Sequence, residues 1–218
     1  WTHRGAGAAA TSSRARVWEN QGHARVSSPF RALRSRNYRL FFIGQGISLI
    51  GSWMTRLATS WLVYRLTDSA FLLGLVAFAG QAPSILLPPL AGVWLDRFDR
   101  HRVLVITQVL SMLQSLALAA LVLSDTVTMP WVIALTVFQG VVNAVEIPTR
   151  QASVVRMIDD RADLSNALAL NSSNFNAARL VGPAIAGPVV AAIGEGYCFL
   201  IDGLSYIAVI WGLLSMQL

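Results

Sequence analysis

The sequence has little charge, a single cysteine and no lysine. Only 13% of its 218 residues are charged and 55% are hydrophobic, whereas soluble domains carry about one quarter charged residues. The lone Cys198 excludes an intramolecular disulfide and a cysteine-based metal cluster, and we expect it to pack as a small apolar residue. These deficits favour a membrane protein over a soluble domain.

The sequence also lacks the motifs of an enzyme. No phosphate-binding loop, zinc pattern or nucleophile and base motif is present, so we expect no catalytic residue, no metal and no cofactor. The formal charge of +6 is the difference between 17 arginines and 11 acidic residues, a balance that would also suit nucleic acid. Those arginines occupy connections between apolar runs, as positive-inside sorting requires, and we therefore expect no nucleic-acid partner.

Six long apolar segments follow one another along the chain. A membrane-crossing helix needs about 20 mostly apolar residues, because its backbone must satisfy its own hydrogen bonds across about 30 Å of hydrocarbon. The charge gaps predict helices over about 38–66, 70–95, 102–124, 129–149, 164–193 and 197–217. A soluble helical core would need polar faces at a period of about 3.6 residues, and the second and third segments show almost none. We predict an all-α polytopic membrane protein.

The first 29 residues differ from the rest. They are rich in Arg, Ala, Gly and Ser and contain no apolar core of the signal-peptide type. We expect a disordered cytoplasmic tail, or translated upstream sequence that is not native, followed by one transmembrane domain over residues 30–218.

The arginines predict the orientation of the domain. They precede the first segment and follow the second and fourth, at Arg31, Arg34, Arg36 and Arg39, at Arg97, Arg100 and Arg102, and at Arg150, Arg156 and Arg161. These ends should be cytoplasmic. The opposite connections carry Asp68, Asp125 and Glu195 and should face outward. The expected location is the plasma membrane, the inner membrane in a bacterium, with a cytoplasmic N-terminus and the lipid bilayer as partner.

Two halves of the domain share short sequence pairs at one constant separation. The pairs are Gln45-Gly46 and Thr55-Arg56 in the first segment, and Gln139-Gly140 and Thr149-Arg150 in the fourth. At the same separation "LLPPLAG" approximates "LVGPAIAG". Because the first and fourth segments cross in opposite directions, the copies form a 3+3 inverted repeat, as in many transporters; chance matching in apolar sequence is the alternative.

Polar residues inside the segments are candidates for a substrate and proton cavity, because an ionisable group at membrane depth costs about 3 kcal/mol or more. They are Gln45, Arg56, Asn143, Glu146, Arg150, Asn176, Arg179 and Asp202. Glu146 reaches Arg150 at i+4. This is either a structural pair near the cytoplasmic boundary or a site that binds a proton or a cationic group and releases it when Arg150 moves.

Two further expectations concern the fifth and sixth segments. Arg179 shares a helical face with Ser172 and Asn176, and this polar stripe should face inward. Asp202 should pair with Arg179 or Arg56. The run that contains Gly182, Pro183, Gly187 and Pro188 permits close helix contact and bending; its role is either packing alone or the movement of a sealing element.

The connection "GVWLDRFDRHR" resembles the signature between helices two and three of the major facilitator superfamily, a glycine, an aspartate four residues later and then basic residues. Gly92, Asp96, Arg97, Arg100 and Arg102 fill those places, and Asp99 stands where the common pattern has glycine. The "DRFDR" form resembles the branch with the enterobactin exporter and macrolide-efflux proteins. "EIPTRQASV" and "NALALNSSNFNAARLVGPAIAG" agree, so the resemblance covers residues 30–218.

The resemblance implies a proton-coupled exporter of small amphipathic molecules, such as drugs, macrolides or siderophores, powered by the proton gradient. It implies that the charged connection, Asp99 included, is a conformational latch, and that the Gly-Pro run is of the antiporter type. Such transporters have twelve helices, so we expect this chain to be the N-terminal half, with the missing C-terminal half as partner. The alternative is a truncated six-helix protein that partners or regulates a complete transporter.

Overall fold

A computed structural model describes residues 31–87, 98–155, 157–158 and 163–216. The expected tail over residues 1–29 and the end of the helix expected over 70–95 lie outside this part. The described residues form a short 3-10 helix and six α-helices and contain no strand, so the all-α class is confirmed. The elements are η1 (Arg31–Arg34), α2 (Arg36–Thr67), α3 (Ala70–Leu86), α5 (Arg100–Leu123), α6 (Met129–Val154), α7 (Leu164–Ile193) and α8 (Glu195–Leu214).

Four of these helices, α5 to α8, are long and apolar enough to cross a membrane. The described part of α3 is apolar but has only 17 residues. Helix α2 has 32 residues, and its polar positions, Gln45 and Arg56 among them, lower its mean hydropathy. The helices therefore define a multi-pass membrane protein. That all six helices cross the membrane remains a prediction.

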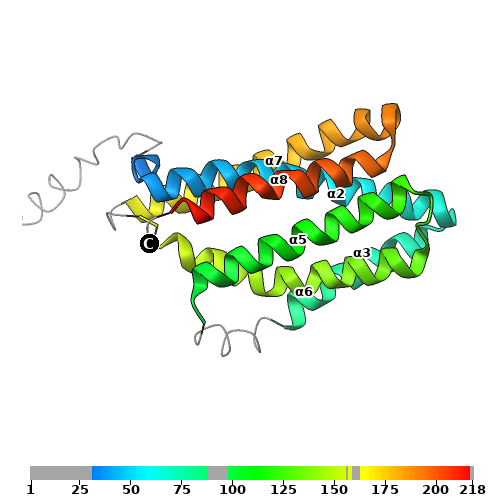
Figure 1. Cartoon of the computed structure of the whole chain (residues 1–218), viewed down its shortest axis with the longest axis horizontal. Coiled ribbons are helices and arrows are strands. Elements are labelled where there is room, and N and C mark those ends of the chain that lie inside the picture. Colours follow the sequence, from blue (N-terminus) through cyan, green and yellow to red (C-terminus); the bar gives the residue numbers. More distant parts are fainter. Residues whose placement is uncertain (1–30, 88–97, 156, 159–162, 217–218) are drawn as a thin grey trace, which may run out of the picture. The chain divides into compact units, whose positions relative to one another are not determined.

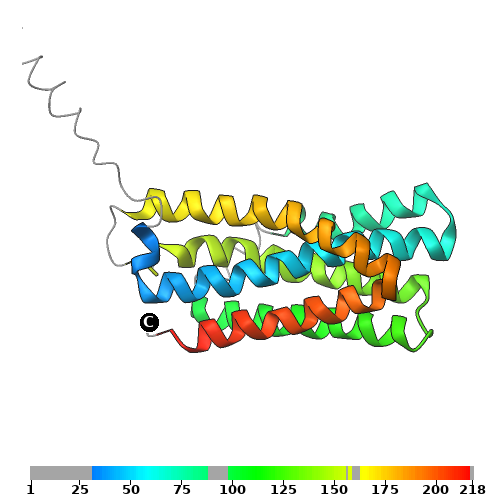
Figure 2. The same ribbon diagram turned by 90° about the horizontal axis from the view of Figure 1, so that it is seen from above.

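The helices run along a common direction, and their connections gather at two ends (Figure 1). The starts of α2, α5 and α7 and the end of α8 lie at one end, together with most of the described arginines (Figures 1 and 2). The short connections after α2, α5 and α7 lie at the other end. Gly194 joins α7 to α8 with a φ of +94°, a backbone conformation that residues other than glycine rarely adopt.

The apolar core consists of two separate clusters. One cluster includes Leu62, Leu118 and Phe199, near the short connections, and also contains Cys198. The other includes Tyr38 and, at the arginine-rich end, the beginning of α5 and the end of α8. Polar side chains occupy the middle of the same helices, so the two clusters position the candidate site between them.

The five most extensive contacts between helices follow a regular scheme. Helix α2 packs on α7 and α8, helix α6 packs on α3 and α5, and α5 packs on α8. These five pairs are preserved as a set when α2 is exchanged with α6, α3 with α7, and α5 with α8. This is the exchange that a 3+3 repeat requires.

Close backbone contacts follow the same scheme. A Cβ atom added at Gly46 would lie 2.9 Å from Oδ1 of Asn174, and one added at Gly140 would lie 2.2 Å from the carbonyl oxygen of Gly80. Gly140 and Asn174 follow Gly46 and Gly80, respectively, at the separation that links Gln45 to Gln139. The contact between α2 and α7 therefore has a counterpart between α6 and α3.

Candidate functional site: a polar cavity between the helices

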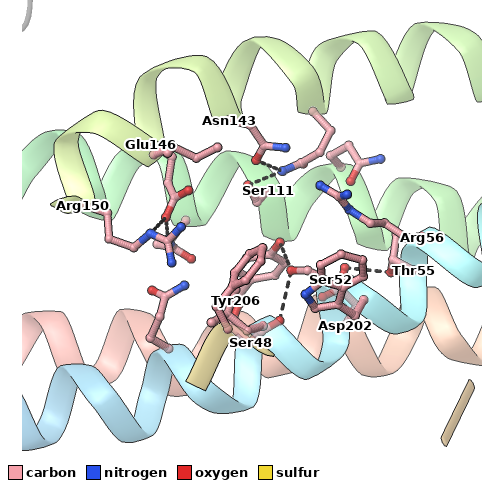
Figure 3. A pocket seen from close by; sticks show the side chains of 18 residues that line it. Ser48, Ser52, Thr55, Arg56, Ser111, Asn143, Glu146, Arg150, Asp202 and Tyr206 are labelled. Atoms are coloured by element: carbon pink, nitrogen blue, oxygen red, sulfur yellow. Dashed lines mark hydrogen bonds and ion pairs between the residues drawn. The ribbon is translucent and has the colours of Figure 1, made fainter. Parts of the chain in front are cut away.

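A cavity of about 140 Å³ lies between α2, α5, α6 and α8, and Phe175 of α7 also lines it (Figure 3). Its polar lining contains most of the candidates that the sequence suggested. The polar and charged lining residues are Gln45, Ser48, Ser52, Thr55, Arg56, Gln108, Ser111, Gln114, Gln139, Asn143, Glu146, Arg150 and Asp202, together with the aromatic Trp53, Phe175 and Tyr206. A bundle that buries this many polar groups in its middle encloses a polar cavity rather than a continuous apolar core.

Helical spacing explains why α6 contributes so much of this lining. Gln139, Asn143, Glu146 and Arg150 follow one another at intervals of three or four residues, which places them on one face of a helix. The Nε2 atom of Gln139 donates to Oδ1 of Asn143 over 3.0 Å and to the Ser111 hydroxyl over 3.0 Å. The face is therefore ordered by contacts of its own side chains as well as by packing.

Glu146 and Arg150 form an ion pair inside the cavity, as their i and i+4 spacing predicts. The Nε atom of Arg150 lies 3.1 Å from Oε1 of Glu146, and both residues are buried. Gln108 on α5 donates to the same Oε1 over 3.4 Å. Figure 3 shows the two charged side chains pointing toward each other across the α6 side of the cavity. One carboxylate thus links α6 to α5.

Helix α5 supplies a polar face that the sequence reasoning missed. Gln108, Ser111 and Gln114 recur every three residues and line the cavity, and the whole set of buried polar residues on α5 is Thr107, Gln108, Ser111, Gln114 and Ser115. The expectation that the third apolar segment has almost no polar face was wrong. These residues carry no charge, so a search for charged positions passed over a polar period that the sequence does contain.

Asp202 on α8 is almost completely buried, with 2% exposure. Its Oδ2 accepts hydrogen bonds from the hydroxyls of Thr55 on α2, over 2.8 Å, and Ser115 on α5, over 2.9 Å. The sequence predicted that Asp202 pairs with Arg179 or Arg56; within the described residues it pairs with neither, because the two hydroxyls are packed against its carboxylate. A Cβ atom at Gly51 would lie 2.6 Å from Oδ1, so this glycine lets α8 approach α2.

Arg56 and Arg179 instead share one aromatic side chain. The guanidinium carbon of Arg56 lies 4.7 Å from the ring centroid of Trp53, and that of Arg179 lies 5.6 Å from it. Trp53 also meets Phe175 edge to face, with ring centroids 5.6 Å apart. Cation–π contact is strongest on tryptophan. Trp53 was not among the predicted residues, and the spacing of Trp53 and Arg56, three positions apart on one helix, was the available signal.

The polar stripe of α7 does not line the cavity as expected. Asn176 and Arg179 are exposed, and Asn176 donates to the backbone oxygen of Ser172 on its own helix over 2.9 Å. Helix α7 turns a face of small residues, Ala178 and Gly182 among them, toward its neighbours. Close helix contact requires small residues at the interface, and this turns the polar stripe outward from the described bundle.

The Gly-Pro run lies in the second half of α7. Pro183 and Pro188 are both inside the helix. A Cβ atom at Gly182 would lie 2.5 Å from Cβ of Trp53, whereas one at Gly187 would have no neighbour within 4 Å. Gly182 therefore permits the contact between α7 and α2, and Gly187 faces open space.

The proposed latch is described only in part. Gly92, Asp96 and Arg97 lie outside the described residues. Asp99 is the N-cap of α5, since its Oδ1 accepts from the backbone N–H of His101 over 3.1 Å, and its other oxygen lies 3.7 Å from Nε of Arg102. Arg100 is the first residue of α5. An aspartate at this place stabilises the helix start.

Apolar helices of spanning length around a buried polar cavity define a multi-pass membrane protein. A sequence profile of the transmembrane secretion effector family matches residues 27–218. The chain belongs to this family of the major facilitator superfamily, and the resemblance noted in its charged connection is confirmed. No solved structure matches it.

Two characterised transporters are similar to this chain. It is 31% identical to the staphyloferrin A transporter of Staphylococcus aureus over 169 residues, and this matched stretch covers 77% of this chain and 42% of that protein. It is also 31% identical to the multidrug efflux pump Tap of Mycolicibacterium fortuitum over 149 residues, and this matched stretch covers 66% of this chain and 36% of that protein. The matched part is thus less than half the length of each relative.

Proposed function

We propose that this chain forms the N-terminal six-helix half of a proton-coupled exporter of small amphipathic molecules, such as drugs, macrolides or siderophores. The observation that carries the proposal is the cavity in the middle of the bundle, which holds the buried carboxylates of Glu146 and Asp202 beside uncharged hydrogen-bonding groups. The names of the two relatives, a siderophore transporter and a multidrug pump, support this substrate class.

A second six-helix half completes the transporter in this proposal. Support comes from the share of the relatives that the chain matches, 42% and 36%, and from the packing scheme of the described helices. A further pair of contacts fits an inverted repeat: Asn174 on α7 donates to the backbone oxygen of Phe42 on α2, and Gly80 on α3 faces Thr136 on α6. Phe42 corresponds to Thr136, and Gly80 corresponds to Asn174, because each pair is separated by the same number of residues as Gln45 and Gln139.

Proton movement is coupled to export at the ion pair of Glu146 and Arg150 on α6. Glu146 accepts a proton when the cavity is open to the side of higher acidity, and the neutral carboxyl then releases Arg150. Arg150 returns to Glu146 when the proton leaves on the other side. The pair suits this cycle because both partners are on one helix and lie inside the cavity, so a change of side-chain rotamer separates or joins them without any movement of the backbone. The proton gradient supplies the energy.

The charged connection over residues 92–102 and the Gly-Pro run of α7 take part in the conformational change between the two access states in this proposal. Asp96 and the arginines of the connection latch the cytoplasmic ends of the helices in one access state, with the N-terminus in the cytoplasm and the protein in the plasma membrane. Asp96→Asn in the full-length protein should shift the balance of inward-open and outward-open states. Equal transport and equal state populations would remove the latch from the scheme.

The test of the proposed function is export by the product of the complete reading frame. Cells that express it should accumulate less radiolabelled erythromycin or siderophore than cells with an empty vector, and a protonophore should abolish the difference. Accumulation that stays equal with and without expression for both probes would contradict export. A reading frame that ends at Leu218 would instead support the six-helix partner protein.

A further inference from the structure

Two arginines without an acidic partner stand beside the cavity. Arg65, Arg102 and Arg150 form ion pairs in the described part of the chain, whereas neither Arg56 nor Arg179 forms one with a described residue. Both contact the ring of Trp53. Two cations on one side chain repel each other, so the arrangement is favoured when an anion lies between or beside them.

The environment of this cluster is suited to an organic anion. Arg56 lines the cavity of about 140 Å³ and also a neighbouring cavity of about 240 Å³. Figure 3 shows the Arg56 side chain extending from α2 into the space between the helices. Trp53 and Phe175 add aromatic surface next to the two guanidinium groups. The cluster therefore offers charge for an anionic group and flat apolar area for the rest of a molecule.

The position of the cluster favours a bound anion over a structural partner among the described residues. Arg179 and Arg56 are exposed on the described bundle, and an arginine at membrane depth costs about 3 kcal/mol or more unless it meets a polar partner. The Glu146 carboxylate already holds Arg150, and Asp202 is held by Thr55 and Ser115. The two acidic groups of the cavity are thus committed elsewhere.

We propose that Arg56, Arg179 and Trp53 form a subsite that binds the carboxylate of an amphipathic organic anion, with the apolar part of that molecule on Trp53 and Phe175. This inference rests on the proposed function and names its substrate class: the exporter accepts anionic amphipathic molecules. A fork of two guanidinium groups binds a carboxylate through several charge-assisted hydrogen bonds.

The experiment measures binding by the full-length protein, purified and reconstituted in phosphatidylcholine nanodiscs, by equilibrium dialysis. The probes are 2-naphthoate and its neutral analogue 2-naphthamide, which share one ring system. Naphthoate should bind about tenfold or more tightly than naphthamide, and Arg56→Gln and Arg179→Gln should each remove most of that preference. Arg39→Gln, an exposed arginine of the same helix α2, is the matched control and should change neither affinity.

Several results would overturn the subsite. Equal affinity for the two probes would do so, as would naphthoate binding that is unchanged in both glutamine variants, which would place the neutralising carboxylates in the other half of the protein. An anionic lipid headgroup offers the same chemistry. Naphthoate binding should therefore persist when phosphatidylglycerol is added to the nanodiscs; its loss would assign the arginines to lipid.

The binding assay uses no gradient and no transport, so it fails independently of the proposed function. Proton-driven export without any preference for naphthoate would leave the exporter in place and remove the anion subsite. Arginine-dependent binding of naphthoate without export would support the anion subsite and contradict the proposed export function.

Discussion

Glu146 and Arg150 lie one helical turn apart on α6 and form an ion pair within the central cavity, with Nε and Oε1 separated by 3.1 Å. Gln108 on the neighbouring helix α5 donates to the same carboxylate oxygen. This arrangement joins two helices through one titratable group, and it is the only carboxylate and guanidinium pair among the described residues that line the cavity.

The pair should be visible in the stability of single and double variants. Glu146→Gln leaves Arg150 without a charged partner, so the free energy of unfolding should fall by about 1.5–3 kcal/mol. The double variant Glu146→Gln/Arg150→Gln should be more stable than the sum of the two single changes predicts, by about 0.5–3 kcal/mol. Thermal denaturation in detergent checks this. Strictly additive melting temperatures would show that the two side chains do not interact.

The contact between α3 and α6 depends on the absence of a side chain at Gly140. Gly140→Ala places a methyl group 2.2 Å from the backbone oxygen of Gly80, and backbone cannot move as easily as a side chain. The variant should lose about 1–3 kcal/mol and melt at a lower temperature. Gly187→Ala on α7 is the control, since a Cβ atom there meets nothing within 4 Å. Equal melting temperatures for both variants would contradict the packing.

Asp99 should matter as a helix cap. Asp99→Ala removes the hydrogen bond to the backbone N–H of His101 and should destabilise the protein by about 1 kcal/mol, whereas Asp99→Asn keeps an acceptor and should change much less. The melting temperatures of the two variants provide the measurement. A loss for asparagine as large as that for alanine would indicate that the charge acts through Arg102 or as part of the latch.

Asp202 should tolerate asparagine but not alanine. The amide oxygen of Asp202→Asn can still accept from the hydroxyls of Thr55 and Ser115, so the junction of α2, α5 and α8 keeps its hydrogen bonds. Asp202→Ala leaves both hydroxyls without this acceptor and should cost about 1–3 kcal/mol. Expression level and melting temperature in detergent distinguish the two variants. Similar stability of both would show that the junction is held by apolar packing alone.

The sequence was informative where one physical rule acts alone. The segment over 164–193, which only Arg179 interrupts, predicted α7 with the bounds that the structure shows, because charged residues are rare along a membrane span. The i and i+4 spacing likewise predicted the contact of Glu146 with Arg150, since both residues are on one helix. Such features need no knowledge of how the helices pack.

The sequence was less informative where packing decides. Helical periodicity gives the polar face of α7, but not its direction. The small residues at Ala178 and Gly182 pack against the neighbouring helices, and Arg179 lies beside Trp53 rather than in the lining of the cavity. The partners of Asp202 are hydroxyls on two other helices, Thr55 and Ser115, which no spacing along α8 can reveal. The cluster of Arg56, Arg179 and Trp53 arises in the same way, from two helices that meet side by side.

Proton movement by the full-length protein tests the central claim most directly. The protein is reconstituted in proteoliposomes that contain a pH-sensitive dye, and the substrate that the cell assay identifies is added on one side. The wild type should move protons when substrate is added, the control Asp125→Asn in the short connection after α5 should do the same, and Glu146→Gln should bind substrate but move no protons. Unchanged proton movement by Glu146→Gln would contradict the account.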